Sequence, residues 1–194
     1  MKLFHDFKNL HEGKKFLVLG CGESAVHANQ VRDAVSIGVN DIQRIFTPEY
    51  LLIVNDRKSF SPGRWEWVEN TRASYIFTHL DIFNDRPNVV KVSLGRYRRP
   101  TLGSDRLDYS NNSPYMAVLL AYYMGAKKIG ILGVDFTPNH FFASTGEHPL
   151  TAKIQDINAD YVGLHTLLKD EGVELVNLSL KSILTIPKET PQEF

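Results

Sequence analysis

Short apolar runs recur along this chain, and most of them end in glycine, asparagine or aspartate before a more polar segment begins. Three segments between or after the runs have helical character, at 24–33, 115–124 and 151–169. Strands that alternate with helices are typical of a mostly parallel sheet covered on both faces. The runs that we expect to be strands are 16–19, 34–39, 50–54, 74–78, 89–92, 128–132 and 173–176.

The sequence therefore predicts an α/β fold with three layers, in which a mostly parallel sheet of six or seven strands carries helices on both faces. A length of 194 residues suits one domain over 1–194, with a core at about 14–178 and an irregular C-terminal tail. Two polar segments, 95–111 and 136–149, are expected to be loops.

The helix ends carry recognisable residues. Ser24 is placed to cap the first helix, and Ser113 to cap the second, with Pro114 at its first position. Residues 115–124 are apolar nearly all round, so this helix is expected to be buried, and Gly125 ends it.

Composition excludes several classes of protein. Lys and Arg together number 22, as do Asp and Glu, so the chain has no overall positive charge for nucleic acid and no such partner is expected. The single cysteine, Cys21, rules out an internal disulfide and fits a reducing compartment. We see neither a signal peptide nor an apolar run of membrane-spanning length, and we therefore expect a cytoplasmic protein. The oligomeric state stays open.

Polar residues follow the expected strands, and in open α/β sheets ligands bind beyond the carboxyl ends of the strands. These strand-end residues are our candidates for a nucleotide site: Gly20, Cys21, Gly22, Glu23, Ser24, Asn40, Asp41, Asn55, Asp56, His79, Gly133, Val134 and Asp135.

Each candidate has a structural alternative. The 20–24 turn can bring its backbone close to a phosphate, or can be a tight turn without a ligand. Asn40 and Asn55 can bind the edge of a base or a sugar hydroxyl, or can close turns through their own backbone. Asp41 and Asp56 can bind a metal, or can cap the helix that follows. Asp135 can accept hydrogen bonds from sugar hydroxyls, or can cap a helix or anchor a loop.

Histidines and arginines lie in the two expected loops. His148 and His140 are candidates for a general base, the alternative being solvated loop residues. Arg98 and Arg99 can bind a phosphate or an anionic acceptor, or can pair with Asp105 and Asp108. The sequence shows no cluster of metal ligands of the zinc type, and no metal site is expected.

Several of these motifs together resemble a known family. The order is a glycine-rich turn, a strand-end asparagine, an Asn-Asp pair, then Ser113-Pro114-Tyr115-Met116 and Gly133-Val134-Asp135-Phe136. This order resembles the bacterial lipooligosaccharide sialyltransferases and the related motility-accessory and 6-hydroxymethylpterin diphosphokinase-like proteins, over most of residues 16–177.

The resemblance implies a Rossmann-like glycosyltransferase core that binds a CMP-sugar through Gly20, Gly22, Ser24, Asn40, Asn55 and Ser113. It also implies that Asp135 belongs to the site and that a loop histidine, His148 first and His140 second, is the general base. The family has a tyrosine directly after its Asp-Phe pair, where this chain has Thr137.

The leading hypothesis is an inverting, metal-independent glycosyltransferase, without a cofactor, that transfers a sugar from a nucleotide-sugar to a glycan or a small hydroxyl acceptor. One alternative is another enzyme on the same scaffold. A pterin diphosphokinase would need Mg²⁺ at Asp56 or Asp135, and a methyltransferase would bind S-adenosylmethionine at 20–22. Another alternative, suggested by Thr137, is a non-catalytic protein that binds nucleotides or glycans.

Overall fold

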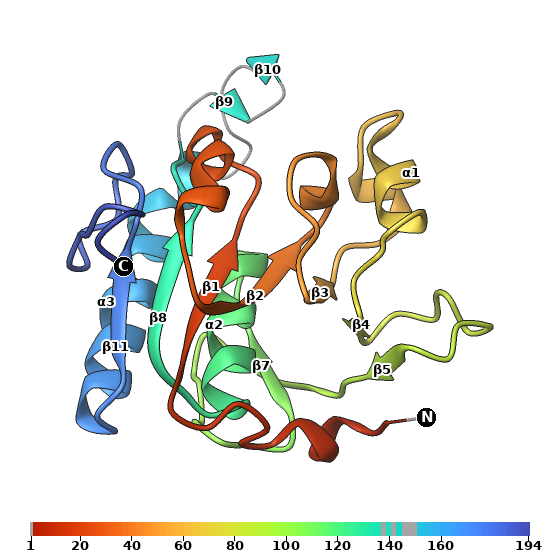
Figure 1. Ribbon diagram of the computed structural model, residues 1–194, viewed down its shortest axis with the longest axis horizontal. Coiled ribbons are helices and arrows are strands. Elements are labelled where there is room, and N and C mark those ends of the chain that lie inside the picture. Colours follow the sequence, from red (N-terminus) through yellow and green to blue (C-terminus); the bar gives the residue numbers. More distant parts are fainter. Residues whose placement is uncertain (1, 137–138, 141–142, 145–150) are drawn as a thin grey trace.

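A seven-stranded parallel sheet forms the centre of the computed structural model, which describes residues 2–136, 139–140, 143–144 and 151–194. The strands lie in the order β11-β8-β1-β2-β3-β4-β5, and every neighbouring pair is parallel. The predicted fold class is therefore confirmed (Figure 1). The strand bounds are β1 Lys14–Leu19, β2 Ala34–Val39, β3 Tyr50–Ile53, β4 Tyr75–Thr78, β5 Val89–Lys91, β8 Ala126–Leu132 and β11 Glu174–Asn177.

Alternate residues of each strand face opposite sides of the sheet and enter two separate cores. In β1, Phe16 and Val18 belong to the core beneath the long helices, whereas Leu17 and Leu19 belong to the core on the other face. All four side chains are at most 2% exposed. A strand buried on both faces needs an unbroken apolar run, which explains why these runs were visible in the sequence.

Two long helices cover one face of the sheet. Helix α2 (Ser113–Tyr123) packs against the middle strands, and α3 (Ile154–Asp170) packs beside it after a short 3₁₀ turn, η5 (Thr151–Lys153). The α2 cap is Asn112 and not Ser113, because the Asn112 side chain accepts a hydrogen bond from the Tyr115 amide at 3.3 Å. Gly125, at φ +94°, ends α2 as predicted.

Short helical segments cover the other face. They are η2 (Glu23–Gln30), η3 (Ile42–Arg44), η4 (Arg57–Ser59) and α1 (Arg64–Glu69). The expected first helix is a 3₁₀ segment without a side-chain cap, because the Ser24 hydroxyl bonds to residues beyond β8 instead. A further 3₁₀ turn, η1 (Phe4–Phe7), places Phe4 and Phe7 in the core beneath the long helices.

Both expected loops contain short strands. Segment 95–111 includes β6 (Leu94–Tyr97) and β7 (Leu107–Tyr109), which pair in parallel because buried Asp108 accepts hydrogen bonds from the Arg96 and Thr101 amides. Segment 136–149 includes β9 (Asn139–His140) and β10 (Ala143–Ser144), an antiparallel pair that lies beyond the carboxyl end of β8 at the top of Figure 1.

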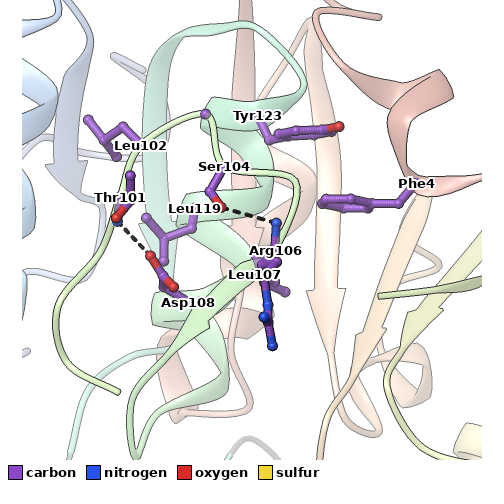
Figure 2. Close-up of a pocket in the computed structure, with 10 residues that line it drawn as sticks. Phe4, Thr101, Leu102, Ser104, Arg106, Leu107, Asp108, Leu119 and Tyr123 are labelled. Carbon is purple, nitrogen blue, oxygen red and sulfur yellow. Dashed lines mark hydrogen bonds between the residues drawn. The ribbon is translucent and has the colours of Figure 1, made fainter. Parts of the chain in front are cut away.

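A small cavity lies under the 101–108 segment, where Phe4 and Tyr123 close one side and Thr101 and Asp108 the other (Figure 2). Its volume of about 10 Å³ is enough for roughly one water molecule. Tyr123 is at the C-terminal end of α2, so this cavity is remote from Ser113 at the start of the same helix.

The segment after β11 contributes to both cores, since Leu184 and Ile186 enter the core beneath the long helices and Leu178 enters the core on the other face. Phe194 packs into the same core as Leu178 with 6% exposure, and the Lys15 ammonium donates a hydrogen bond to the Phe194 carbonyl oxygen at 2.7 Å. The Asn177 amide donates to Pro187, so the tail also lies along the edge strand β11. Within the described ranges, no helix has the length and apolar character needed to cross a bilayer.

Candidate functional site: a polar edge at the strand ends

Four neighbouring strands, β8, β1, β2 and β3, end at one edge of the sheet, and the start of α2 lies against the same edge. The fold therefore brings together candidates that are far apart in the sequence. They form three groups in contact along the edge, which we describe as the amide cluster, the glycine turns and the Asp41 clamp.

The amide cluster consists of Asn40, Asn55 and Ser113. The Asn55 amide nitrogen donates to Asn40 Oδ1 and to Ser113 Oγ, at 3.2 Å in both cases. Asn40 follows β2, Asn55 follows β3, and Ser113 is the first residue of α2. Three residues that the sequence selected separately are thus in direct contact.

The backbone of Asn40 explains why asparagine suits this position. Its φ of +55° is in the left-handed region, which asparagine tolerates better than most residues. This turn directs the chain away from β2 immediately after Val39, and the Asn40 side chain reaches Asn55 across the end of the neighbouring strand.

The glycine turns hold the ends of β1 and β8 together. The Gly22 amide donates to the Gly133 carbonyl at 2.8 Å, and the Gly20 amide donates to Leu132 at 2.8 Å. A Cβ atom at Gly20 would lie 2.3 Å from the Gly133 oxygen, and Gly133 itself has φ +74°. Glycine is required here because one strand-end turn packs directly on the other.

Asp135 lies under these turns and is only 1% exposed. Its Oδ2 accepts the Ser24 amide at 2.8 Å, and its Oδ1 accepts the Ser24 hydroxyl at 2.7 Å and the Ser179 hydroxyl. Ser24 Oγ in turn accepts the Gly133 amide at 2.9 Å. Asp135 thereby connects the turn after β1, the turn after β8 and the tail. This is the structural role, anchoring a loop, that the sequence offered as the alternative to ligand binding. A catalytic role for it stays a prediction.

The Asp41 clamp follows directly after Asn40. Asp41 is fully buried, and its carboxylate accepts two hydrogen bonds from Arg64, of which the Nε–Oδ2 distance is 3.0 Å. Burial alone lowers the pKa of Arg64, but hydrogen bonding and the charge of Asp41 raise it overall, so the guanidinium stays charged.

Cys21 belongs to the same group. Its thiol lies 3.6 Å from Asp41 Oδ1 and 3.6 Å from the Val39 carbonyl, and donates towards both. Burial raises the pKa of the Cys21 thiol, and the Asp41 carboxylate raises it further. A neutral, buried thiol is a packing group and not a nucleophile.

Two other candidates make structural contacts. Asp56 caps η4 and accepts the Ser59 amide at 3.2 Å, and Glu23 lies 3.5 Å from the Lys181 ammonium. The cap was the expected alternative for Asp56.

The arginine candidates separate. Arg98 donates to Asp160 of α3 at 2.9 Å and lies 3.5 Å from Asp156, so it pairs with α3 and not with Asp105 or Asp108. Hydrogen bonding to Asp160 raises the pKa of Arg98. Arg99 is exposed.

The histidine candidates lie in the segment beyond β8. The backbone of His140 forms part of β9, and His148 lies outside the described residues. Their proposed role as general base stays a prediction.

Sequence reasoning missed two contributors to the edge. Asn112 Oδ1 accepts the hydroxyl of the buried Tyr161 at 2.6 Å, which fixes the start of α2 against α3. In the Asn112-Ser113-Pro114 sequence either of the first two residues could cap the helix. The hydrogen bond from Tyr161 of α3 holds the Asn112 side chain in the capping position. Arg64 was also missed, because nothing local shows that it reaches Asp41.

His79 follows β4 as expected, and its Nδ1 is buried without a hydrogen-bond partner among the described residues. Burial lowers the pKa of His79, and the nearby Lys91 lowers it further.

Comparison with known proteins shows which class of fold this is. No protein-family model matches the sequence, and no curated protein matches it either. Solved structures do match, among them two sialyltransferases and a Maf glycosyltransferase.

The sialyltransferase CST-II from Campylobacter jejuni, solved with a trisaccharide acceptor and CMP, has a TM-score of 0.59 and 15% identity over 93% of this chain and 88% of its own. The α-2,3-sialyltransferase Cst-I from the same organism has a TM-score of 0.57 and 13% identity, covering 94% of this chain and 82% of its own. The Maf glycosyltransferase from Magnetospirillum magneticum has a TM-score of 0.57 and 13% identity, and the match covers 98% of this chain and 38% of the Maf chain. The likeness confirms, at the level of fold, the predicted resemblance to sialyltransferases and related glycosyltransferases, and it does not support the diphosphokinase-like part of that prediction.

Proposed function

We propose that this protein is a glycosyltransferase that binds a nucleotide-sugar, most favourably a CMP-sugar, at the polar edge of its sheet. The observation that carries the proposal is the amide cluster, in which Asn40, Asn55 and Ser113 meet beyond the strand ends. The shared fold with CST-II, which was solved with CMP, supports the choice of nucleotide.

The hydrogen bonds inside the amide cluster determine what it offers to a ligand. Asn55 uses its amide nitrogen within the cluster, so its Oδ1 remains as an acceptor among the described contacts. Asn40 and Ser113 accept from Asn55, which leaves the Asn40 amide and the Ser113 hydroxyl as donors. Two adjacent donor groups suit anionic oxygens, and the acceptor suits an amino or hydroxyl group.

The α2 N-terminus adds to this preference. The dipole of a helix of 11 residues gives its N-terminal end partial positive charge, which favours a phosphate or carboxylate oxygen beside Ser113. Pro114 has no N–H and the Tyr115 amide bonds to Asn112, so the Ser113 amide is the donor at this end. A nucleotide-sugar combines anionic phosphate oxygens with hydroxyl donors and therefore fits this arrangement.

In the proposed reaction, the sugar leaves the nucleotide phosphate through a transition state of oxocarbenium character. The acceptor hydroxyl attacks the anomeric carbon from the opposite side, which inverts its configuration. His148 takes the proton of that hydroxyl, and the Ser113 amide and hydroxyl at the positive end of the α2 dipole stabilise the departing phosphate. The proposal includes no metal, and the acceptor is a glycan or a small hydroxyl compound.

Nucleotide binding is the first test. Calorimetry should show CMP binding to the wild-type protein in preference to UDP, GDP, ADP and S-adenosylmethionine. Replacing Asn55 with alanine removes two hydrogen bonds and the remaining acceptor, and should weaken CMP binding about tenfold. Asn84→Ala, an exposed change between β4 and β5, is the matched control.

The same titrations separate the alternatives. Binding of CMP by Asn55→Ala with wild-type affinity would refute the assigned site. Nucleotide binding that requires Mg²⁺ would favour a diphosphokinase, and preferential binding of S-adenosylmethionine would favour a methyltransferase.

Turnover is the second test. With a CMP-sugar and EDTA present, the wild-type protein should release CMP, and His148→Ala should lower kcat by about 10²–10⁴-fold. His27→Ala is the control, since His27 is an exposed histidine near the end of η2 and has no role in the proposed reaction. Unchanged kcat in His148→Ala would remove this residue from the mechanism. CMP binding without release would indicate a non-catalytic binding protein.

A further inference from the structure

The Asp41 clamp contains a buried charge that the proposed mechanism does not use. Asp41 is fully buried, and Arg64 is only 16% exposed at its side chain. A carboxylate is costly to bury, and it is retained in an apolar core only with well-placed donors. Arg64 supplies two of them, and the Cys21 thiol supplies a weak third. The guanidinium of Arg44 adds a longer ion pair, at 3.8 Å from Asp41 Oδ2.

The clamp connects two parts of the molecule. Asp41 belongs to the turn after β2, and Arg64 is the first residue of α1, whose Trp65 and Val68 pack into the core on that face of the sheet. The Phe60 ring lies 5.5 Å from the Arg64 guanidinium carbon and covers it. Arg64 is thus held on both sides and acts as a fixed point for Asp41.

Asn40 lies between two such fixed points. On one side, Val39 is the last residue of β2, and its carbonyl lies 3.6 Å from the Cys21 thiol. On the other side, the carboxylate of Asp41 is held by Arg64. The left-handed backbone of Asn40 is therefore constrained from both neighbours, and its side chain is presented to Asn55.

We infer that Arg64 and Asp41 are positioning residues for the nucleotide site, which hold the Asn40 turn so that Asn40 and Asn55 form one preorganised recognition element. The expected effect of this ion pair on nucleotide affinity rests on the proposed function, whereas its effect on the position of Asn40 does not. The ion pair acts on the site through the chain, because Arg64 bonds to Asp41, which directly follows Asn40.

The experiment uses Arg64→Met, Arg64→Lys and the double variant Asp41→Asn/Arg64→Met. Arg64→Met leaves a buried carboxylate without its main partner and is expected to lower stability. The double variant removes both charges and should recover stability, since an uncharged pair avoids the cost of burial. Lys128→Met, which breaks an ion pair of 2.7 Å with Glu189, is the matched control.

Two readouts distinguish positioning from stability. The first is CMP affinity, which should fall about tenfold in the double variant despite its recovered stability, and by less in Arg64→Lys. The second is the side-chain amide NMR signal of Asn55, assigned by its loss in Asn55→Ala. It should shift in the double variant towards its position in Asn40→Ala, and should not shift in Lys128→Met.

The outcomes are separable. If the folded double variant keeps the wild-type Asn55 signal, the positioning inference is wrong. If the signal shifts as expected but the wild-type protein binds no nucleotide, the positioning holds and the proposed function fails. If the wild-type protein binds CMP and the double variant binds it equally well, the clamp does not serve the nucleotide site.

Discussion

Single residues at the strand ends were the most predictable part of the candidate site. Asn40, Asn55 and Ser113 were selected because each follows or precedes a clear element, and the parallel sheet brings them together. Their partners were not predictable, because Asp41 is held by a residue of α1 and Asp135 by a residue of the tail. Local sequence shows where a strand ends but not which distant side chain reaches that point.

His79 gives a pH-dependent prediction at this scale. Burial, assisted by Lys91, lowers its pKa in the folded state, so the unfolded chain binds a proton first as the pH falls below about 6.5. The folded state is then disfavoured, and this part of the stability is lost as the pH decreases. The variant His79→Phe should therefore lose less thermal stability than the wild type between pH 7 and pH 5.5.

The melting temperature measured across this range checks the prediction. Asn84→Ala, an exposed exchange between β4 and β5 that removes no titratable group, is the control. A His79→Phe profile parallel to that of the wild type would contradict it.

At the scale of elements, the apolar runs predicted all seven strands of the central sheet to within two residues at each end. Elements that depend on tertiary contacts were missed. Pairing of β6 with β7 depends on buried Asp108, and Gly95 must be glycine because a Cβ there would collide with that carboxylate. Likewise, η2 is not an α-helix, since Ser24 bonds to Asp135 and does not cap it.

The glycine turns give a prediction for this scale. A Cβ at Gly22 would lie 2.4 Å from Asp135 Oδ2 and 2.8 Å from the Gly133 oxygen, so Gly22→Ala must displace one turn. We expect a loss of about 1–3 kcal/mol in the free energy of unfolding, measured in urea.

Gly163→Ala is the matched exchange, because Gly163 lies on the exposed side of α3 and an added Cβ there would meet no other atom within 4 Å. It should instead gain about 0.5–1 kcal/mol, as alanine does in a helix. Equal effects of the two exchanges would refute the packing argument for the turns.

At the scale of the whole molecule, the tail is part of the core and not an appendage, although its Pro and polar residues suggested an irregular end. Phe194 packs against Gly130 of β8, where a Cβ would lie 2.9 Å from the ring. The sequence could not show this, because a single terminal aromatic carries no periodic pattern.

Phe194→Ala should therefore cost about 3–5 kcal/mol, as for a buried aromatic side chain. Denaturation in urea measures this loss. Leu180→Ala, at 60% exposure in the same tail, should change the free energy by less than about 0.5 kcal/mol. A small effect of Phe194→Ala would show that the tail does not stabilise the sheet.

The central place of β1 has a consequence for biosynthesis. This strand is translated well before its neighbour β8, and Phe194, whose carbonyl accepts a hydrogen bond from Lys15, is translated later still. Until then one side of β1 has no strand to pair with, and the Gly20–Gly22 backbone lacks Gly133. A nascent chain must keep this hydrophobic strand from aggregating, and the polar edge at its carboxyl end is completed only after β8 has been made.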